Sequence, residues 1–253
     1  MHGLSSPPVL VFGLDGTILR CNSFPLWVHF LMNGEIGGLS LGQRVMLSVR
    51  TAHLVALRKT RWLTHDELQR RLQMASEHVG TAATDRFVAD LLLLRSRPNL
   101  RSMLGILVSR GADAILATAA AADYAEPLGQ QLGFRHVLAT RRNRNARECA
   151  NSGTAKRDRV SAFLEDAGWH DRPLILFTSQ LDDLPLMQES MVVCWFGSID
   201  LLASARSNSW RTKFIDCRDM TGESLYARLP PLCGYAALCG DVARRSSSKM
   251  ILS

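Results

Sequence analysis

The stretch VLVFGLDGT, residues 9–17, decides how the rest of the chain is interpreted. Its first four residues form a continuous apolar run, which is typical of a strand that a parallel sheet buries on both faces. The five residues that follow contain two glycines, one aspartate and one threonine. We therefore expect a buried strand at residues 9–12 that opens into a glycine-containing loop.

Similar patterns recur along the chain. Further short apolar runs lie at residues 114–117, 174–177 and 191–196. Apolar residues recur with helical spacing between them, at residues 100–109, 125–132 and 157–167. Gly168 supplies a stop signal after the last of these helices. Strands that alternate with helices predict the α/β class, with a doubly wound parallel sheet.

The segment between about residues 24 and 97 interrupts this alternation, because it contains helical patterns and no convincing strand. Two such patterns cover residues 43–57 and 66–79. Thr64 is the expected N-cap of the second helix, and Glu67, three residues later, completes a predicted capping box. We therefore expect a helical module inserted directly after the first strand and its loop.

The predicted division of the chain has two parts and a tail. Residues 1–20 and 99–253 form the α/β core, and residues 21–98 form the inserted helical cap. Pro98 marks the return from the insert to the core. Residues 244–249 are basic and rich in serine, and we expect the last ten residues, about 244–253, to be flexible.

The chain has 253 residues, of which 47% are hydrophobic and 21% charged, and this ordinary globular usage excludes intrinsic disorder and collagen-like repeats. Its formal charge of +7 suits an anionic partner without identifying one. The six cysteines show no paired metal or redox spacing, as expected for reduced thiols. The chain lacks a signal-like start and a long uninterrupted apolar window, so we expect a cytoplasmic protein without a membrane span.

Four chemistry-bearing pieces follow one another along this scaffold. They are the loop around Asp15, Thr118 at the end of the second apolar run, Lys156 just before a helix, and residues 179–186 after the third run. Three of the four follow strands, and ligands of open α/β sheets bind outside the carboxyl ends of the strands. We therefore expect these pieces to form one site.

These residues resemble the motifs of the haloacid dehalogenase superfamily, and more narrowly its phosphoserine-phosphatase-like branch. ILAT at residues 115–118, YAEPL at 124–128 and LGF at 132–134 are similar to the second motif of that branch. The resemblance extends from Val9 to about Phe214, and the position of the helical insert matches the cap of the branch. It implies a Rossmann-like core, a helical cap and descent from Mg²⁺-dependent phosphomonoesterases.

The resemblance also implies roles for particular residues. Active relatives begin D-x-D-G-T, where the first aspartate attacks phosphorus and the second is the general acid and base. Asp15 matches the acid/base position. Its backbone carbonyl matches a Mg²⁺ ligand, as does the carboxylate of Asp183. The phosphate-binding positions are matched by Thr17, Thr118 and Lys156.

Two positions depart from the family pattern. Gly13 stands where the nucleophile belongs, and Ser179 stands where the principal metal-binding carboxylate belongs. Glycine cannot form an acyl phosphate, and a neutral serine oxygen is a poor ligand for a hard cation. Asp182 is a weak substitute for the lost metal ligand. We expect a catalytically impaired protein, or pseudophosphatase, that binds a phosphorylated or anionic ligand and little or no Mg²⁺.

Other interpretations stay open. Water positioned by Asp15 could attack phosphorus directly and give residual or altered phosphatase activity. The arginine-rich stretch 135–159 is expected to be a solvated face, with binding of an acidic protein or nucleic acid as the alternative. The apolar and basic stretch 39–61 could contact a membrane surface. One helical face is expected to pack the insert, or to offer an aromatic contact to substrate, and it comprises Phe24, Trp27, Phe30 and Leu31.

Overall fold

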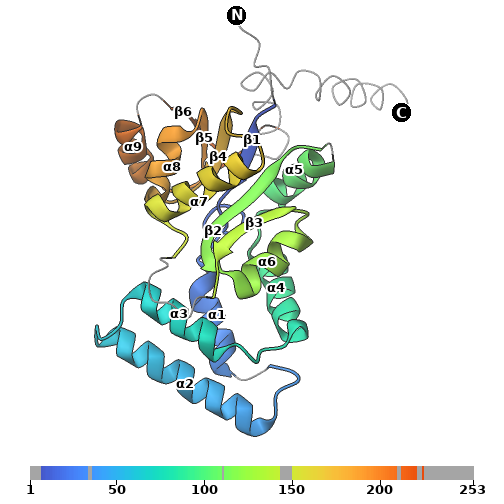
Figure 1. Cartoon of the computed structure of the whole chain (residues 1–253), viewed down its shortest axis with the longest axis vertical. Coiled ribbons are helices and arrows are strands. Elements are labelled where there is room, and N and C mark those ends of the chain that lie inside the picture. The colour runs from blue at the N-terminus through green and yellow to red at the C-terminus, as the bar shows by residue number, and fades with distance from the viewer. Residues whose placement is uncertain are drawn as a thin grey trace, which may run out of the picture.

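The computed structural model describes residues 7–33, 36–109, 111–142, 150–209, 212–220 and 224. Within these residues, six strands form one parallel sheet in the order β3-β2-β1-β4-β5-β6 (Figure 1). The strands are β1 (Val9–Phe12), β2 (Ala114–Ala121), β3 (His136–Thr140), β4 (Leu174–Thr178), β5 (Val192–Trp195) and β6 (Lys213–Asp216). The predicted α/β class, with its Rossmann-like doubly wound sheet, is confirmed.

The central strands are apolar throughout because both of their faces are buried. Successive residues of a strand point to opposite sides of the sheet. In β1, Leu10 and Phe12 belong to one hydrophobic cluster, whereas Val9 and Val11 belong to a second. The neighbouring strand β4 divides in the same way, and its Phe177 stacks on Phe12 with ring centroids 4.1 Å apart. A continuous apolar run in the sequence is therefore the signature of this position in the sheet.

Helices alternate with these strands. They are α5 (Pro98–Ser109), α6 (Ala122–Gln131), α7 (Gly153–Asp166), α8 (Leu184–Glu189) and α9 (Ile199–Asn208), with a short 3-10 turn η1 (Leu181–Asp183) before α8. The first three are the helices predicted between the apolar runs, and each begins earlier than predicted. Gly168 follows α7 with φ of +69°, a left-handed conformation that favours glycine, so the predicted stop signal is confirmed.

The segment between β1 and α5 contains four helices and no strand among its described residues (Figure 1). They are α1 (Ser23–Asn33), α2 (Leu41–Lys59), α3 (His65–Ala75) and α4 (Thr81–Arg95). The predicted extension of α3 to Val79 was wrong, because the helix is capped at Ser76, whose hydroxyl donates to the carbonyl of Gln73 at 3.2 Å. The assignment of residues 21–98 to a separate cap domain stays a prediction.

The start of α3 was predicted only in part. Thr64 is the N-cap, and its hydroxyl accepts a hydrogen bond from the N–H of Glu67 at 3.2 Å. The carboxylate of Glu67 binds Arg70 and Arg71 instead, at 2.7 and 2.6 Å, so the reciprocal half of the predicted capping box was wrong. A complete capping box begins α2, where Ser40 and the third residue of the helix bond to each other.

The chain enters and leaves the insert at one place. The N–H of Arg20 donates to the carbonyl of Arg95 at 2.8 Å, and the N–H of Arg97 donates to the carbonyl of Ile18 at 2.8 Å. The residues between these bonds form an antiparallel bridge. The two crossings are therefore fastened to each other.

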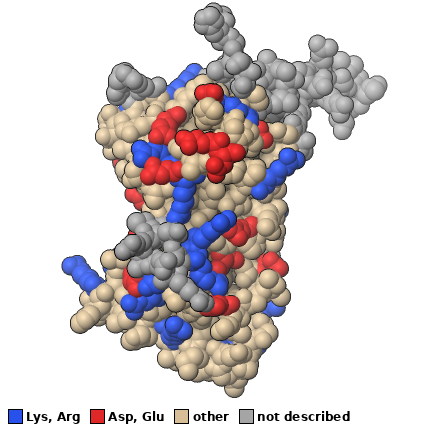
Figure 2. All heavy atoms as spheres, viewed as in Figure 1, with Lys and Arg blue, Asp and Glu red and all other residues tan. Residues whose placement is uncertain are grey.

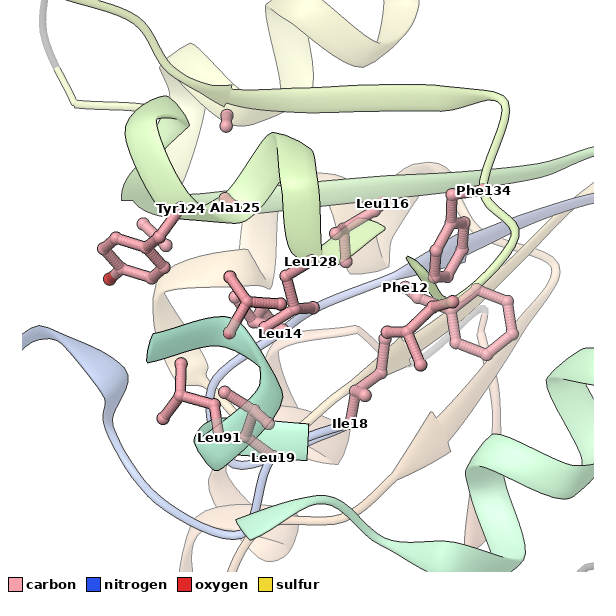
Figure 3. Packing of buried hydrophobic residues seen from close by; sticks show 14 of the residues in the cluster. Phe12, Leu14, Ile18, Leu19, Leu91, Leu116, Tyr124, Ala125, Leu128 and Phe134 are labelled. Carbon is pink, nitrogen blue, oxygen red and sulfur yellow. The ribbon is translucent and has the colours of Figure 1, made fainter. Parts of the chain in front are cut away.

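One hydrophobic cluster runs from the sheet into the insert. Figure 3 shows Leu14, from the loop after β1, beside Leu128 of α6, with Leu91 of α4 on the insert side. Trp27 of α1 is 1% exposed and packs on Tyr124 of α6, with ring centroids 5.2 Å apart. The ring centroid of Trp27 also lies 5.0 Å from that of Phe87 of α4, so at Trp27 the helical face predicted to pack the insert does so.

No helix of the described residues is long and apolar enough to cross a membrane. The predicted flexible tail, about 244–253, lies outside the described residues. Arg144 and Arg147 of the predicted basic stretch lie outside them as well.

Candidate functional site

A cavity of about 290 Å³ lies where β1, β2 and β4 end, between the sheet and the insert. From the core it is lined by Gly13, Leu14, Asp15, Thr118, Ala119, Ala120, Ala150, Ser152, Lys156, Thr178, Gln180, Asp182 and Asp183. From the insert it is lined by Asn22, Phe24, His65, Asp66 and Gln69. The structure thus brings most predicted site positions together, while Thr17 and Ser179 lie buried behind the lining.

Gly13 occupies the end of β1, where its N–H donates to the carbonyl of Phe177 at 2.8 Å. A β-carbon on Gly13 would lie 3.3 Å from Thr17 Oγ1 and 3.4 Å from that carbonyl oxygen. The Thr17 hydroxyl is buried and finds no hydrogen-bond partner among the described residues. A side chain at residue 13 therefore needs only small adjustments of its neighbours, and it would lie beside an unpartnered hydroxyl.

Asp15 is held by the first residue of α1. The N–H of Ser23 donates to Asp15 Oδ1 at 2.9 Å, and the Ser23 hydroxyl is hydrogen-bonded to the hydroxyl of Tyr124 at 2.8 Å. Burial raises the pKa of the Asp15 carboxyl, although the hydrogen bonds from Ser23 and the charge of Lys156 oppose the shift. Burial, together with the negative charge of Asp15, also raises the pKa of Tyr124. The protonated form of Asp15 therefore persists to higher pH than that of a free aspartate.

The raised pKa of Asp15 predicts a pH-dependent gain in stability for Asp15→Asn. The folded state binds the Asp15 proton more tightly than the unfolded chain does, so the native protein loses stability as the pH rises through the raised pKa. The amide has no proton to lose and can still accept the Ser23 N–H. Urea unfolding should show the variant gaining stability relative to the native chain from about pH 4 to neutral pH. A difference that is constant with pH would contradict the raised pKa.

Ser179 contacts a backbone group that the family pattern assigns to metal. Its hydroxyl donates to the carbonyl of Asp15 at 3.1 Å, and the amide of Gln180 donates to the Ser179 hydroxyl at 3.3 Å. Gly16 lies so close that a β-carbon there would be 2.2 Å from Ser179 Oγ, and its φ of +72° also favours glycine. The Asp15 carbonyl, a predicted ligand, thus accepts a hydrogen bond from within the protein.

Lys156 and Asp183 form a buried ion pair in the cavity wall. Lys156 Nζ lies 2.5 Å from Asp183 Oδ1, and the two side chains are 8% and 2% exposed. Thr178 Oγ1 donates to Asp183 Oδ2 at 2.5 Å. Both contacts are charge-assisted hydrogen bonds to a buried carboxylate. The pair also ties α7, which carries Lys156, to η1, which carries Asp183.

Two glutamines of α3 bind the ends of β2 and β3, and neither was predicted from the sequence. Gln69 Nε2 donates to the carbonyl of Ala119 at 2.7 Å, and Gln73 Nε2 donates to the carbonyl of Thr140 at 2.8 Å. Both glutamines are buried. Two amides four residues apart on the buried side of a predicted helix were the available signal, because buried polar groups are almost always hydrogen-bonded.

Arg97 was missed as well. Its guanidinium donates from Nε to the carbonyl of Thr17 at 3.0 Å and from Nη2 to the carbonyl of Gly16 at 3.2 Å, and it lies 5.6 Å from the ring centroid of Phe196. The fork of donors thereby holds the backbone of the loop after β1. Nothing in the sequence distinguishes Arg97 from the arginines around it.

The insert side of the cavity adds three polar residues that were not predicted from the sequence, namely Asn22, His65 and Asp66. Phe24, from the predicted aromatic face, also lines the cavity, and its ring centroid lies 4.8 Å from that of His65 in an edge-on arrangement. An aromatic contact between Phe24 and a ligand stays a prediction.

Comparisons with solved structures show a shared fold. A protein with unknown function from Bordetella pertussis Tohama I is 18% identical, with a TM-score of 0.65 over 83% of this chain and 99% of that chain. A probable phosphoserine phosphatase from Vibrio cholerae is 13% identical, with a TM-score of 0.54 over 88% of this chain and 66% of that chain. A phosphoserine phosphohydrolase-like protein from Francisella tularensis is 13% identical, with a TM-score of 0.52 over 88% of this chain and 99% of that chain.

Sequence comparison identifies the family of this chain without identifying its function. No curated protein gives a significant match. The family model described as haloacid dehalogenase-like hydrolase matches residues 10–188, a segment that contains the loop after β1, the insert, Lys156 and Asp183. The chain therefore belongs to the haloacid dehalogenase-like hydrolases, and its fold resembles that of phosphoserine phosphatases.

Proposed function

We propose that this protein is a pseudophosphatase that binds a phosphorylated or other anionic ligand in the cavity without forming an aspartyl-phosphate. The observation that carries the proposal is Gly13 at the end of β1, in the position that the family motif gives to the nucleophile. Glycine has no side-chain atom that could attack phosphorus. In well-studied hydrolases, loss of the nucleophile lowers the rate on the order of 10⁴–10⁶-fold.

The oxygen donors of the cavity support a second part of the proposal, that Mg²⁺ binds weakly or not at all. Magnesium requires several oxygen ligands in near-octahedral geometry. The carbonyl of Asp15 accepts the Ser179 hydroxyl, and the two oxygens of Asp183 accept hydrogen bonds from Lys156 and Thr178. Asp182 lines the cavity but is exposed to solvent. These oxygen atoms, as arranged, do not fit the coordination of a magnesium ion, and the proposed function requires no metal.

The family pattern explains how the cavity could accept an anion although Asp15, Asp66, Asp182 and Asp183 line it. Aspartates at positions 13 and 179 would bring two negative charges, which a divalent cation balances in the family pattern. With neutral residues at both positions and no cation, the net formal charge around the phosphate position equals that of the family pattern. The hydroxyl of Thr118, the N-terminus of α7 and Lys156, whose ammonium also pairs with Asp183, then remain as partners for an anion. The joint replacement of both aspartates is therefore compatible with retained binding.

Separate measurements of turnover and binding test this proposal. Hydrolysis of p-nitrophenyl phosphate with Mg²⁺ should stay far below about 1 s⁻¹, an ordinary enzymatic rate. Inorganic phosphate or orthovanadate should raise the melting temperature. Thr118→Val should lose most of this shift because it removes a hydroxyl from the cavity. Thr84→Val, at a buried threonine of α4 that does not line the cavity, is the matched control. Ordinary turnover, or no shift in the native chain, would contradict the proposal.

Residual hydrolysis is a second candidate, and the environment of Asp15 favours it. The carboxyl lines the cavity, is oriented by the Ser23 N–H and has a raised pKa, which suits a group that exchanges a proton with water. Any slow phosphatase rate should then disappear in Asp15→Asn. A rate that survives this substitution belongs to another site or to a contaminant.

The alternative of a basic interaction face receives less support from the described arginines. Arg142 lies 2.7 Å from the carboxylate of Asp123, and Arg157 lies 2.5 Å from that of Asp158. Such pairs reduce the charge that a nucleic acid or an acidic protein would meet. Salt-sensitive co-purification with one specific partner would favour this alternative over the cavity-based proposal.

A further inference from the structure

The outer face of α2 is apolar although it is exposed. Leu41, Val45, Met46 and Val49 are 78%, 54%, 67% and 60% exposed, and offsets of four, five and eight residues from Leu41 place them on one side of the helix. The opposite side is buried, at Leu47, Thr51 and Leu54. A surface helix of a globular protein normally presents polar residues to water. The outer face of α2 therefore requires an explanation other than internal packing.

The charges carried by α2 and by the turn that follows it have one sign. Residues 36–65 contain no aspartate or glutamate and carry five cations, which are Arg44, Arg50, Arg58, Lys59 and Arg61. None of the five forms an ion pair within the part of the chain that the structure describes. Trp62, just beyond the helix, is 81% exposed. These cations lie next to exposed aliphatic and indole side chains. Such a combination is complementary to a surface with an apolar interior and a negatively charged exterior.

The position of α2 leaves the face accessible. Figure 1 shows α2 at the end of the insert farthest from the sheet, with α1 and α3 on its inner side. Figure 2 shows this end of the molecule as mainly uncharged surface with scattered basic side chains. A flat partner could therefore reach α2 without meeting the acidic side chains that the upper part of Figure 2 displays.

We infer that the outer face of α2 docks on the surface of an anionic lipid bilayer. The apolar side chains enter the boundary between headgroups and acyl chains, and the surrounding cations contact the lipid phosphates. A second copy of the chain is a poorer partner, because it would bring five further cations to the same contact. The contact is peripheral, and it is independent of what the cavity binds.

Vesicle flotation of the full chain tests this inference. We expect binding to vesicles of phosphatidylcholine mixed with phosphatidylglycerol, weak or no binding to phosphatidylcholine alone, and release when NaCl is raised from about 0.05 to about 0.5 M. Val45→Glu/Val49→Glu should lower binding at least about tenfold, because it places charge in the centre of the apolar face. The emission of Trp62 should shift to the blue on binding, and Trp62→Phe should remove that part of the shift.

The matched control is Leu93→Glu, which changes a leucine on α4 that is more exposed (79%) than Val45 and Val49, and it should leave vesicle binding unchanged. Circular dichroism and melting temperature identify any variant that fails to fold. The inference is wrong if the native chain ignores anionic vesicles. It is also wrong if the chain forms a dimer that Val45→Glu/Val49→Glu dissociates, because the face would then join two copies.

Discussion

The Gly13→Asp/Ser179→Asp double variant should hydrolyse p-nitrophenyl phosphate with Mg²⁺ at least about 100-fold faster than the native chain. The first substitution supplies an attacking carboxylate at the end of β1, where a β-carbon meets Thr17 Oγ1 at 3.3 Å. The second places a carboxylate beside the Asp15 carbonyl, in place of a hydroxyl that now donates to it. Asp15, Thr118 and Lys156 already line the same cavity, so we expect the two missing carboxylates to be the main chemical deficit.

The two single variants separate the nucleophile from the metal site. Gly13→Asp alone adds a negative charge without the second carboxylate that would hold a cation, so it should weaken phosphate binding and remain inactive. Ser179→Asp alone should gain Mg²⁺ affinity, measured as an Mg²⁺-dependent rise in melting temperature, without turnover. If the double variant folds and binds Mg²⁺ but does not hydrolyse the substrate, the positions of the remaining groups, rather than the lost carboxylates, prevent catalysis.

Lys156→Met should produce the largest loss of stability among single substitutions in the cavity. It removes the cation from Asp183, whose side chain is 2% exposed and would keep only Thr178 as a hydrogen-bond donor. Breaking a buried ion pair by removing one partner costs about 3–5 kcal/mol. At about 2–4 °C per kcal/mol for a protein of this size, the melting temperature should fall by roughly 10 °C. Urea unfolding monitored by circular dichroism measures the change in free energy directly.

Two controls test whether the loss comes from the unpaired carboxylate. Lys156→Met/Asp183→Asn removes both charges and should recover part of the stability that Lys156→Met loses. Arg157→Met breaks solvent-accessible ion pairs with Asp158 and Glu189 and should change stability by less than about 1 kcal/mol. A Lys156→Met effect as small as that of Arg157→Met would show that water or a rearranged donor compensates Asp183.

The sequence predicted the strands that are buried on both faces and missed those at the edges. The central strands β1 and β4 read as continuous apolar runs because each of their residues enters one of two hydrophobic clusters. The edge strands β3 and β6 were missed. Lys213 and Asp216 bound β6, and His136 begins β3, so neither segment shows the apolar run on which the prediction depended. An edge strand owes its conformation to its single neighbour more than to its own composition.

The candidate site was predictable where a residue follows a strand and was not predictable where it comes from the insert. Asp15 follows β1 and Thr118 lies in β2. The topology of a parallel sheet alone brings these two residues to one edge. Gln69 and Arg97 contact the same edge through the docking of the insert, which depends on packing between segments that are distant in the sequence. Spacing along the chain does not carry that information.

The two chain crossings at Arg20 and Arg97 connect the insert to the loop after β1 by hydrogen bonds. Arg97 is bonded on one side to the other crossing and on the other side to the carbonyls of Gly16 and Thr17. A rotation of the insert about these two crossings would strain the backbone of residues 16 and 17, beside the cavity. Ligand binding in the cavity would then change the equilibrium between orientations of the insert, and the orientation of the insert would change the ligand affinity by the same coupling free energy.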